Sequence, residues 1–154
     1  MDKRYKPIAY VAGGLFVMIA VAKALIHFGF HDHDQPSFVI ALICDIVVGL
    51  TFCVFGCWAF IRFPGTRAVG EILATWGIAC LLIVLVAPLA GASYPFHSGA
   101  GDFFQGIWIF AAVGLGGALL GALIAVGSGK DYRAQALARF QMTAQAKPRR
   151  VVKR

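Results

Sequence analysis

Residues 103–128 read FFQGIWIFAAVGLGGALLGALIAVGS and contain no charged side chain. A helix needs roughly 20 apolar residues to cross the hydrocarbon core of a bilayer, because each residue adds about 1.5 Å to its length. This stretch is long enough to do so. It therefore predicts a transmembrane helix.

Three further apolar stretches precede it, at residues 7–30, 38–63 and 68–92. Transmembrane β-strands would show alternating segments of about 10 residues, and that alternation is absent. The connections are short, which places consecutive helices side by side in opposite directions. The sequence predicts an all-α membrane protein: an antiparallel bundle of four transmembrane helices (residues 1–128), then a cytoplasmic amphipathic helix and basic tail (residues 129–154).

The composition of the whole chain agrees with this class. Of 154 residues, 60% are hydrophobic and 14% are charged, whereas a soluble domain carries about 25% charged residues. The mean hydropathy is +0.79. The sequence has no glycine-rich phosphate loop, no nucleophile with a paired base and no deep histidine pair for a haem. We expect no enzymatic activity from this chain.

The basic residues predict the orientation. Thirteen of the fourteen lysines and arginines, all except Lys23, lie before the first apolar stretch, beside the turn that joins the second and third stretches (Arg62 and Arg67), or after the fourth. The other two loops carry Asp32, Asp34 and Asp102 and no basic residue. By the positive-inside rule, both termini lie in the cytoplasm, in a plasma membrane of the bacterial inner-membrane type. The net charge of +7 is therefore a topology signal, and no nucleic-acid partner is expected.

Two charged residues, Lys23 and Asp45, fall well inside the predicted spans, away from their cytoplasmic ends. Lys23 and Asp45 each lie roughly 10 Å from the outer boundary, on neighbouring antiparallel helices. An intramembrane ion pair between them is the simplest interpretation. A site that binds or moves ions or protons, and pairing with another subunit, are the alternatives. His27 lies one turn above Lys23 and is a candidate for a proton path or a quinone headgroup.

The predicted outer loops collect imidazole and carboxylate groups. They are His31, Asp32, His33 and Asp34 in one loop, and His97 and Asp102 in the other. Imidazole with carboxylate suits zinc, copper or iron, but this spacing matches no named metal motif. A solvated polar loop is the plain interpretation, with a metal, pH-sensing or quinone site as the alternatives. No cofactor is predicted beyond this metal candidate.

Small residues recur every four positions on two predicted helices. Gly114, Ala118 and Ala122 form one ridge of the fourth helix, and Gly117, Gly121 and Ala125 form a second. The second helix carries a stripe that includes Asp45, Gly49, Cys53 and Cys57. Such ridges let helix backbones approach closely in lipid. The two ridges of the fourth helix either both pack within the bundle, or one of them serves another polypeptide.

After Ser128 the chain becomes polar. Gly129 is a candidate helix-breaking hinge, and residues 130–146 are expected to form a helix along the membrane, with Leu137 and Phe140 near one side. The basic side chains on and after this helix are Arg139, Lys147, Arg149, Arg150, Lys153 and Arg154. Each gains about 1 kcal/mol near an anionic leaflet. Lipid association and docking to a cytoplasmic partner are the two interpretations of this tail.

The start of the third predicted helix carries one expected ion pair. Glu71 follows Arg67 by four residues, so the two side chains share a helix face. A carboxylate near a helix N-terminus is also stabilised by the helix dipole. Trp58 is expected to be an interfacial anchor near this end.

These features lead to three functional hypotheses. The first is a small accessory or assembly subunit of a larger inner-membrane complex, of the respiratory or energy-transducing kind, that acts by helix packing and tail docking. The second is an oligomeric transporter or an ion or proton channel that uses Lys23, Asp45 and His27. The third is a metal-binding membrane protein of the outer face. The expected partners are the anionic cytoplasmic leaflet and other membrane subunits.

Overall fold

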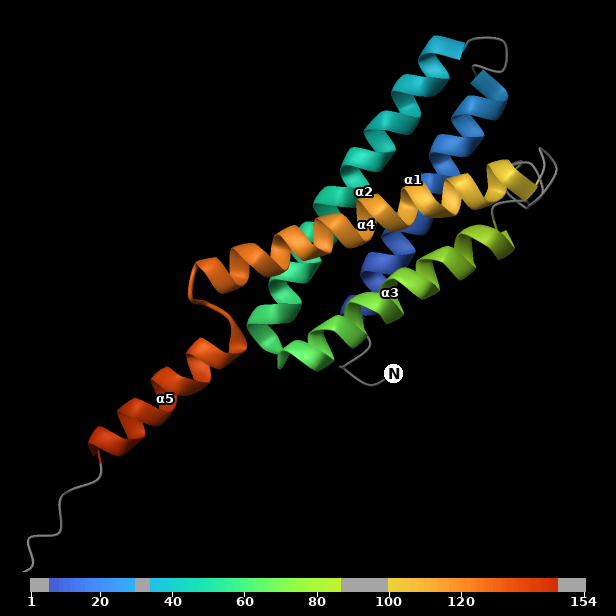
Figure 1. Cartoon of the computed structure of the whole chain (residues 1–154). Helices are drawn as coiled ribbons and strands as arrows, with labels where there is room; N and C mark the ends of the chain where they lie inside the picture. The colour runs from blue at the N-terminus through green and yellow to red at the C-terminus, as the bar shows by residue number, and fades with distance from the viewer. Residues whose placement is uncertain (1–5, 30–33, 87–99, 147–154) are drawn as a thin grey trace, which may run out of the picture.

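The computed structural model describes residues 6–29, 34–86 and 100–146. Every element in these ranges is an α-helix: α1 (Lys6–Gly29), α2 (Asp34–Arg62), α3 (Gly65–Val86), α4 (Ala100–Gly127) and α5 (Tyr132–Ala146). The first four helices form the body of the molecule, and α5 extends away from one end of it (Figure 1). The all-helical class predicted from the sequence is confirmed.

α2, α3 and α4 begin three or four residues earlier than the apolar stretches that predicted them, and α1 begins one residue earlier. α2 begins at Asp34, α3 at Gly65 and α4 at Ala100, so polar residues form their first turns. Pro36 is accommodated in the first turn of α2, where a backbone N–H would have no helical partner. Residues 87–92, which the sequence assigns to the third helix, lie outside the described residues.

The connection between α2 and α3 consists of Phe63 and Pro64 alone. The Pro64 carbonyl accepts hydrogen bonds from the backbone N–H groups of Arg67 and Ala68, both at 2.9 Å. These bonds close the first turn of α3 directly after the proline. α2 and α3 are therefore joined by a rigid corner.

Each helix of the body buries one narrow stripe of side chains, spaced three and four residues apart as one helical face requires. The stripes consist of Ile8, Ala12 and Leu15 in α1; Val48, Phe52, Phe55 and Ala59 in α2; Ala68, Ile72, Thr75 and Ala79 in α3; and Ala118, Ala122 and Ala125 in α4. Alanines are frequent among them, so the helices approach closely.

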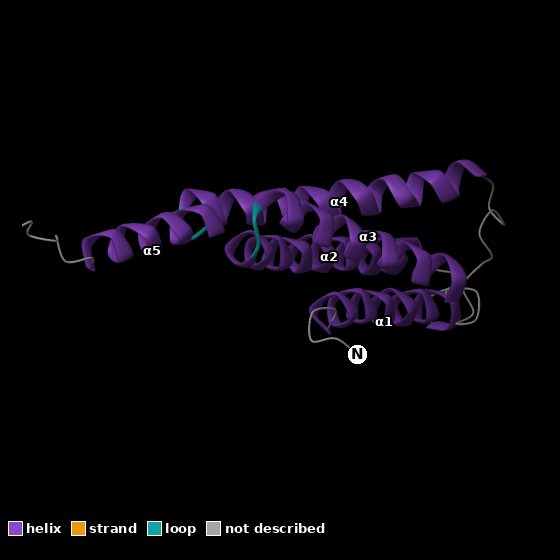
Figure 2. Ribbon diagram, turned by 90° about the horizontal axis from the view of Figure 1, so that it is seen from below, coloured by secondary structure: helices purple, strands orange, loops and turns teal. Residues whose placement is uncertain are grey.

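α2 is the central helix. It packs most extensively on α4, and it also contacts α1 and α3, while α1 packs chiefly on α3. Seen from below, α4 and α1 lie on opposite sides of a layer formed by α2 and α3 (Figure 2). The largest contact thus joins two helices that are not consecutive in sequence.

α2 and α4 run parallel to one another with their backbones in contact. Gly49 of α2 meets Gly117 of α4, and Cys53, one turn further along α2, meets Gly121, one turn further along α4. A methyl group added at Gly56 would lie 2.5 Å from the carbonyl oxygen and 2.9 Å from the Cα atom of Ala118. A side chain at Gly117 or Gly121 would overlap the backbone carbonyl opposite. Glycine is therefore required where these helices cross.

An aromatic cluster joins α2, α3 and α4. The Trp76 indole is stacked on Phe110 with ring centroids 6.5 Å apart, and Phe52 meets Phe110 edge-on at 6.4 Å. Gly114 leaves room for this cluster, because a methyl group there would lie 3.3 Å from the Phe52 ring and 3.6 Å from Trp76. The cluster adds a contact between α3 and α4, which otherwise touch little.

Two stretches of the described residues are long and apolar enough to cross a membrane, Val39–Arg62 and Ile107–Thr143. Only 22% and 28% of their respective apolar windows are buried by the rest of the chain. A core helix of a soluble protein would be mostly enclosed. The apolar surfaces of these two stretches therefore remain largely uncovered.

We expect Gly117→Ala to lower the free energy of unfolding by about 1–3 kcal/mol, because the added methyl group forces α2 and α4 apart. The matched control is Gly116→Ala, since a methyl group at Gly116 meets no described atom within 4 Å. Higher helix propensity should make that control neutral or stabilising by up to about 1 kcal/mol. Unfolding by SDS in mixed micelles measures both variants. Equal effects of the two substitutions would contradict the backbone contact.

Candidate functional site

Both small-residue ridges of α4 pack against α2. Gly117 and Gly121 meet the α2 backbone, and Ala118 of the other ridge contacts Gly56. Ala122 and Ala125 are buried as well. Cys53 and Cys57, on the predicted stripe of α2, flank Gly121 with their backbone atoms. Both ridges therefore make contacts within the chain at these residues.

Asp45 is half-buried and lies one turn before Gly49, on the side of α2 that meets α4. α1, which carries Lys23, also packs on α2. The side chain of Lys23 lies outside the described part of the structure. The ion pair between Lys23 and Asp45 therefore stays a prediction.

The polar residues predicted at the outer end are only partly described. Asp34 and Asp102 lie in the first turns of α2 and α4, and His27 lies near the end of α1. The side chains of these three residues, and all of His31, Asp32, His33 and His97, lie outside the described part. Among the side chains that are described, no three metal-ligating groups come together. The metal, pH-sensing and quinone interpretations stay predictions.

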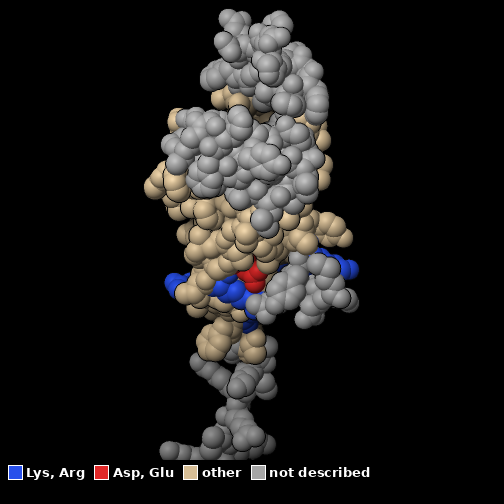
Figure 3. Space-filling model, turned by 90° about the vertical axis from the view of Figure 1, so that its right-hand side faces the viewer, with Lys and Arg blue, Asp and Glu red and all other residues tan. Residues whose placement is uncertain are grey.

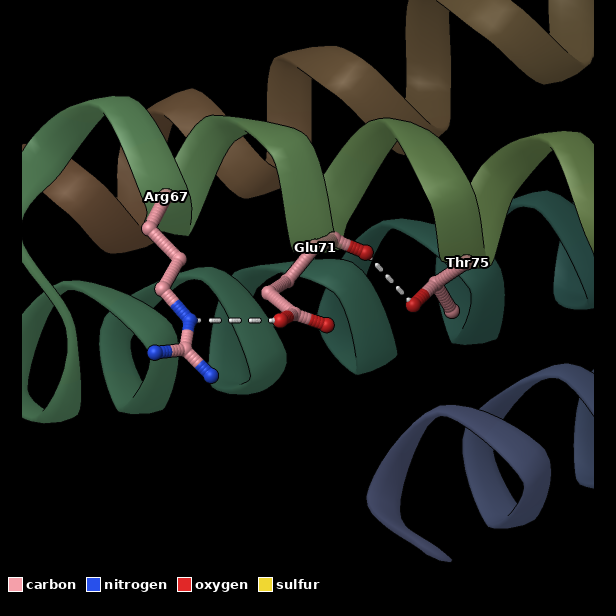
Figure 4. A network of polar contacts seen from close by, with 3 residues as sticks. All are labelled: Arg67, Glu71 and Thr75. Carbon is pink, nitrogen blue, oxygen red and sulfur yellow. Dashed lines mark hydrogen bonds and ion pairs between the residues drawn. The ribbon is translucent and has the colours of Figure 1, made fainter. Parts of the chain in front are cut away.

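The corner between α2 and α3 holds a short polar network (Figure 4). The Nε atom of Arg67 lies 3.6 Å from Oε1 of Glu71, which is the ion pair expected from the sequence. The Thr75 hydroxyl donates to the backbone carbonyl of Glu71 at 2.8 Å. Thr75 is fully buried, and this bond within its own helix satisfies the hydroxyl.

A row of aromatic rings supports Arg67 from α2. Its Cζ atom lies 4.6 Å from the centroid of the Phe63 ring, a cation–π contact. Phe63 meets the Trp58 ring edge-on at 5.6 Å, and Trp58 is stacked on Phe55 at 5.5 Å. Phe55 is buried in the core. We call Phe55, Trp58 and Phe63 the aromatic row.

Sequence reasoning missed the aromatic row and treated Trp58 as an isolated anchor. The available signal is that Phe63 and Arg67 flank Pro64 and Gly65. A tight turn at these residues brings an aromatic ring and a guanidinium together.

The junction between α4 and α5 is a structured elbow, which we define as residues 125–135. Gly129 has a φ of 64°, the backbone N–H of Lys130 donates to the Ala125 carbonyl at 3.1 Å, and that of Gly129 donates to the Val126 carbonyl at 3.0 Å. This is a Schellman C-cap, in which glycine takes the left-handed conformation.

The start of α5 completes the elbow. The Asp131 carboxylate accepts a hydrogen bond from the backbone N–H of Arg133 at 3.2 Å and so caps the helix. The Gln135 side chain donates to the Lys130 carbonyl at 2.8 Å. These bonds make residues 129–131 a defined corner, whereas the sequence predicted a hinge.

α5 projects beyond the end of the body and touches it only through a small contact with α2 (Figures 1 and 2). Leu137, Phe140 and Met142 are 63%, 72% and 68% exposed. Leu137 and Phe140 were expected near one side of this helix. Met142 lies about 200° around the helix from Phe140, so a further large apolar side chain is exposed on another side. Arg139 is exposed, and residues 147–154 with the rest of the basic tail lie outside the described part.

No protein-family model matches this chain, and no curated protein or solved structure matches it either. Its function therefore has to follow from its own geometry. The features available are the α2–α4 contact, the network at Arg67, the elbow and the exposed helix α5.

We expect Gly129→Ala to loosen the elbow, because a left-handed conformation costs an L-residue about 1–2 kcal/mol. Hydrogen exchange followed by mass spectrometry should show faster exchange across residues 127–135. The control is Gly127→Ala, at the last residue of α4, where a methyl group meets no described atom within 4 Å. Unchanged exchange in Gly129→Ala would show that the elbow does not depend on the glycine.

If Lys23 and Asp45 pair, Lys23→Met or Asp45→Asn alone should destabilise the protein by about 3–5 kcal/mol, because one buried charge is left uncompensated. The double variant should recover most of that loss. Unfolding measurements on all four proteins form a double-mutant cycle. A double variant no more stable than the single variants would rule out the pair.

Proposed function

We propose that the chain is an integral membrane protein with four transmembrane helices and both termini in the cytoplasm of a bacterial-type inner membrane. The large uncovered apolar surface of α2 and α4 supports this proposal, because lipid would cover it. α1 and α3 are 24 and 22 residues long, which is also sufficient to cross the hydrocarbon core. All four helices of the body would then span the bilayer.

The relative directions of the helices also support this topology. In this topology α2 and α4 cross the membrane in the same direction, because α3 crosses it once in the opposite direction between them. The contacts between α2 and α4 agree, since the two helices run parallel. Arg62 at the end of α2, Arg67 at the start of α3 and Lys130 after α4 then share one end of the body. Figure 3 shows lysine and arginine gathered at one level of the visible described surface, with a broad uncharged surface next to them. A membrane protein with this end in the cytoplasm has such a distribution.

Within that membrane we propose that the chain is a small accessory subunit of a larger complex of the respiratory or energy-transducing kind, in which the partner subunits carry out the chemistry. The observation that carries this proposal is the projection of α5 beyond the body with Leu137 and Phe140 exposed next to one another on its surface. Large apolar side chains exposed together mark interaction surfaces. A membrane body without a described catalytic cluster and with such a helix suits a docking role.

The elbow would set the direction of docking. Because Gly129, Asp131 and Gln135 fix the corner, the orientation of α4 determines that of α5. A preformed docking helix loses less conformational freedom on binding than a flexible tail does. The four helices would thus act as a membrane anchor that presents α5 to a partner subunit.

Extraction from the native membrane in mild detergent, followed by mass spectrometry of the co-purifying chains, tests the accessory role. A stoichiometric set of larger membrane subunits is the expected result. A homogeneous species built only of this chain would overturn the proposal, and ion-flux assays on Asp45 variants would then address a channel.

We expect the double substitution Leu137→Ser and Phe140→Ser to release the partner subunits at least tenfold more readily, because interface anchors contribute about 2 kcal/mol or more each. Membrane insertion should not change, since α5 lies outside the body. Gln141→Ser, at an exposed polar position of the same helix, is the control. Quantitative mass spectrometry of the extracted complex gives the ratio of subunits.

Two results would contradict α5 docking. Partners retained in full by the double variant would place the interface elsewhere. Weaker vesicle binding by the double variant than by the wild type, both purified without partner subunits, would instead assign α5 to the lipid surface.

A further inference from the structure

We propose that Arg67 binds the phosphate of an anionic glycerophospholipid in the cytoplasmic leaflet, an inference that rests on the proposed membrane topology. The side chain is 42% exposed, at the corner where α2 meets α3. This corner belongs to the basic end of the body, where lipid headgroups would lie.

The guanidinium is oriented, but its terminal nitrogens remain available. Its Nε atom faces Glu71 at 3.6 Å, which is longer than a hydrogen bond. Figure 4 shows the two terminal nitrogens turned away from the Glu71 carboxylate. No contact to an acceptor in the described residues occupies them. These nitrogens form the planar fork that binds two oxygens of one phosphate.

The aromatic row holds this fork in place. The guanidinium carbon of Arg67 lies over the Phe63 ring, and Trp58 and Phe55 support Phe63 from the buried core. An arginine held in this way loses little rotational freedom when a ligand binds.

A strip of small residues runs from Arg67 along α3 toward the apolar surface. Gly70, Ala74 and Gly77 follow Arg67 at intervals of three and four residues, so they lie on nearly the same side of the helix. Methyl groups at Gly70 and Gly77 would meet no described atom within 4 Å, and Ala74 is exposed. The strip leaves space beside the helix in which an acyl chain can lie while its phosphate meets Arg67.

The acyl-chain strip favours a lipid over a soluble phosphate, because soluble phosphate gains nothing from an apolar surface. The surrounding charges favour an anionic headgroup. Lys6, Arg62 and Lys130 belong to the same end of the body as Arg67, and Glu71 offsets only part of this positive charge. A lipid headgroup that carries a second negative group, or that lacks the choline ammonium, would therefore bind more tightly.

Native mass spectrometry of the full chain, released from nanodiscs of equal phosphatidylglycerol and phosphatidylcholine, tests the proposal. We expect the wild-type protein to retain phosphatidylglycerol, and Arg67→Lys to retain roughly fivefold less, because lysine keeps the charge but loses the two-pronged fork. Arg62→Lys is the matched control and should retain as much as the wild type. Phe63→Leu leaves every charge in place and should also lower retention.

Three outcomes would overturn the inference. Equal losses in Arg67→Lys and Arg62→Lys would indicate diffuse attraction without a site. Gly70→Leu fills the strip of small residues. Unchanged retention of phosphatidylglycerol by Phe63→Leu and by Gly70→Leu would show that neither the aromatic row nor the strip contributes to binding. Displacement of phosphatidylglycerol by inorganic phosphate at millimolar concentration would assign the fork to a soluble anion.

A separate measurement distinguishes this inference from the proposed topology. Wild-type protein that fails to float with vesicles after alkaline carbonate treatment would overturn the membrane proposal itself. Protein that floats, while Arg67→Lys retains phosphatidylglycerol like the wild type, would overturn only the lipid site. Thermal unfolding of each variant in the same detergent identifies any that has lost its fold.

Discussion

The backbone contact between α2 and α4 is the constraint on which the rest of the arrangement depends. At Gly56, Gly117 and Gly121 no side chain separates the two helices, so their crossing point and their relative shift along the axis are both determined. α1 and α3 then pack on the remaining surface of α2. The aromatic cluster at Trp76 fills the space left between α3 and α4. Dispersion between closely packed backbones is the attraction that remains available where lipid removes the hydrophobic drive.

This kind of packing explains why so much apolar surface stays uncovered. Each helix of the body buries one narrow stripe in which alanine is frequent, and many large side chains outside these stripes, such as Leu50, Val54 and Leu123, stay exposed. In water that surface would carry a large free-energy penalty. In lipid it carries none. A lipid surrounding would therefore account for both the close glycine contacts and the exposed leucines.

The sequence was sufficient for the helical class, because helix formation depends on local composition and periodicity. It could not identify which helices meet. A glycine ridge shows that something approaches closely, but the ridges at Gly114 and Gly117 are compatible with any neighbour, and the structure assigns both to α2. Lys23 and Asp45 were expected to meet because both lie at the same depth in the predicted spans. Depth follows from the rise per residue, but whether two side chains face one another depends on how each helix is rotated about its axis. The hinge at Gly129 was recognised as a break, but its rigidity depends on Asp131 and Gln135, whose bonds form only when the corner closes.

The two polar networks described at helix ends, the Arg67 network and the elbow, lie at the same end of the molecule. The Arg67 network follows α2, and the elbow follows α4, so both stand at the ends of the two helices whose contact is most constrained. Because α2 and α4 cannot slide past one another without overlapping at Gly117, the distance between the Arg67 corner and the elbow is also constrained. A lipid held at the first would therefore lie at a set position relative to a partner held by α5. Glycine packing inside the body would thus define the spatial relation between the proposed lipid site and the proposed docking helix.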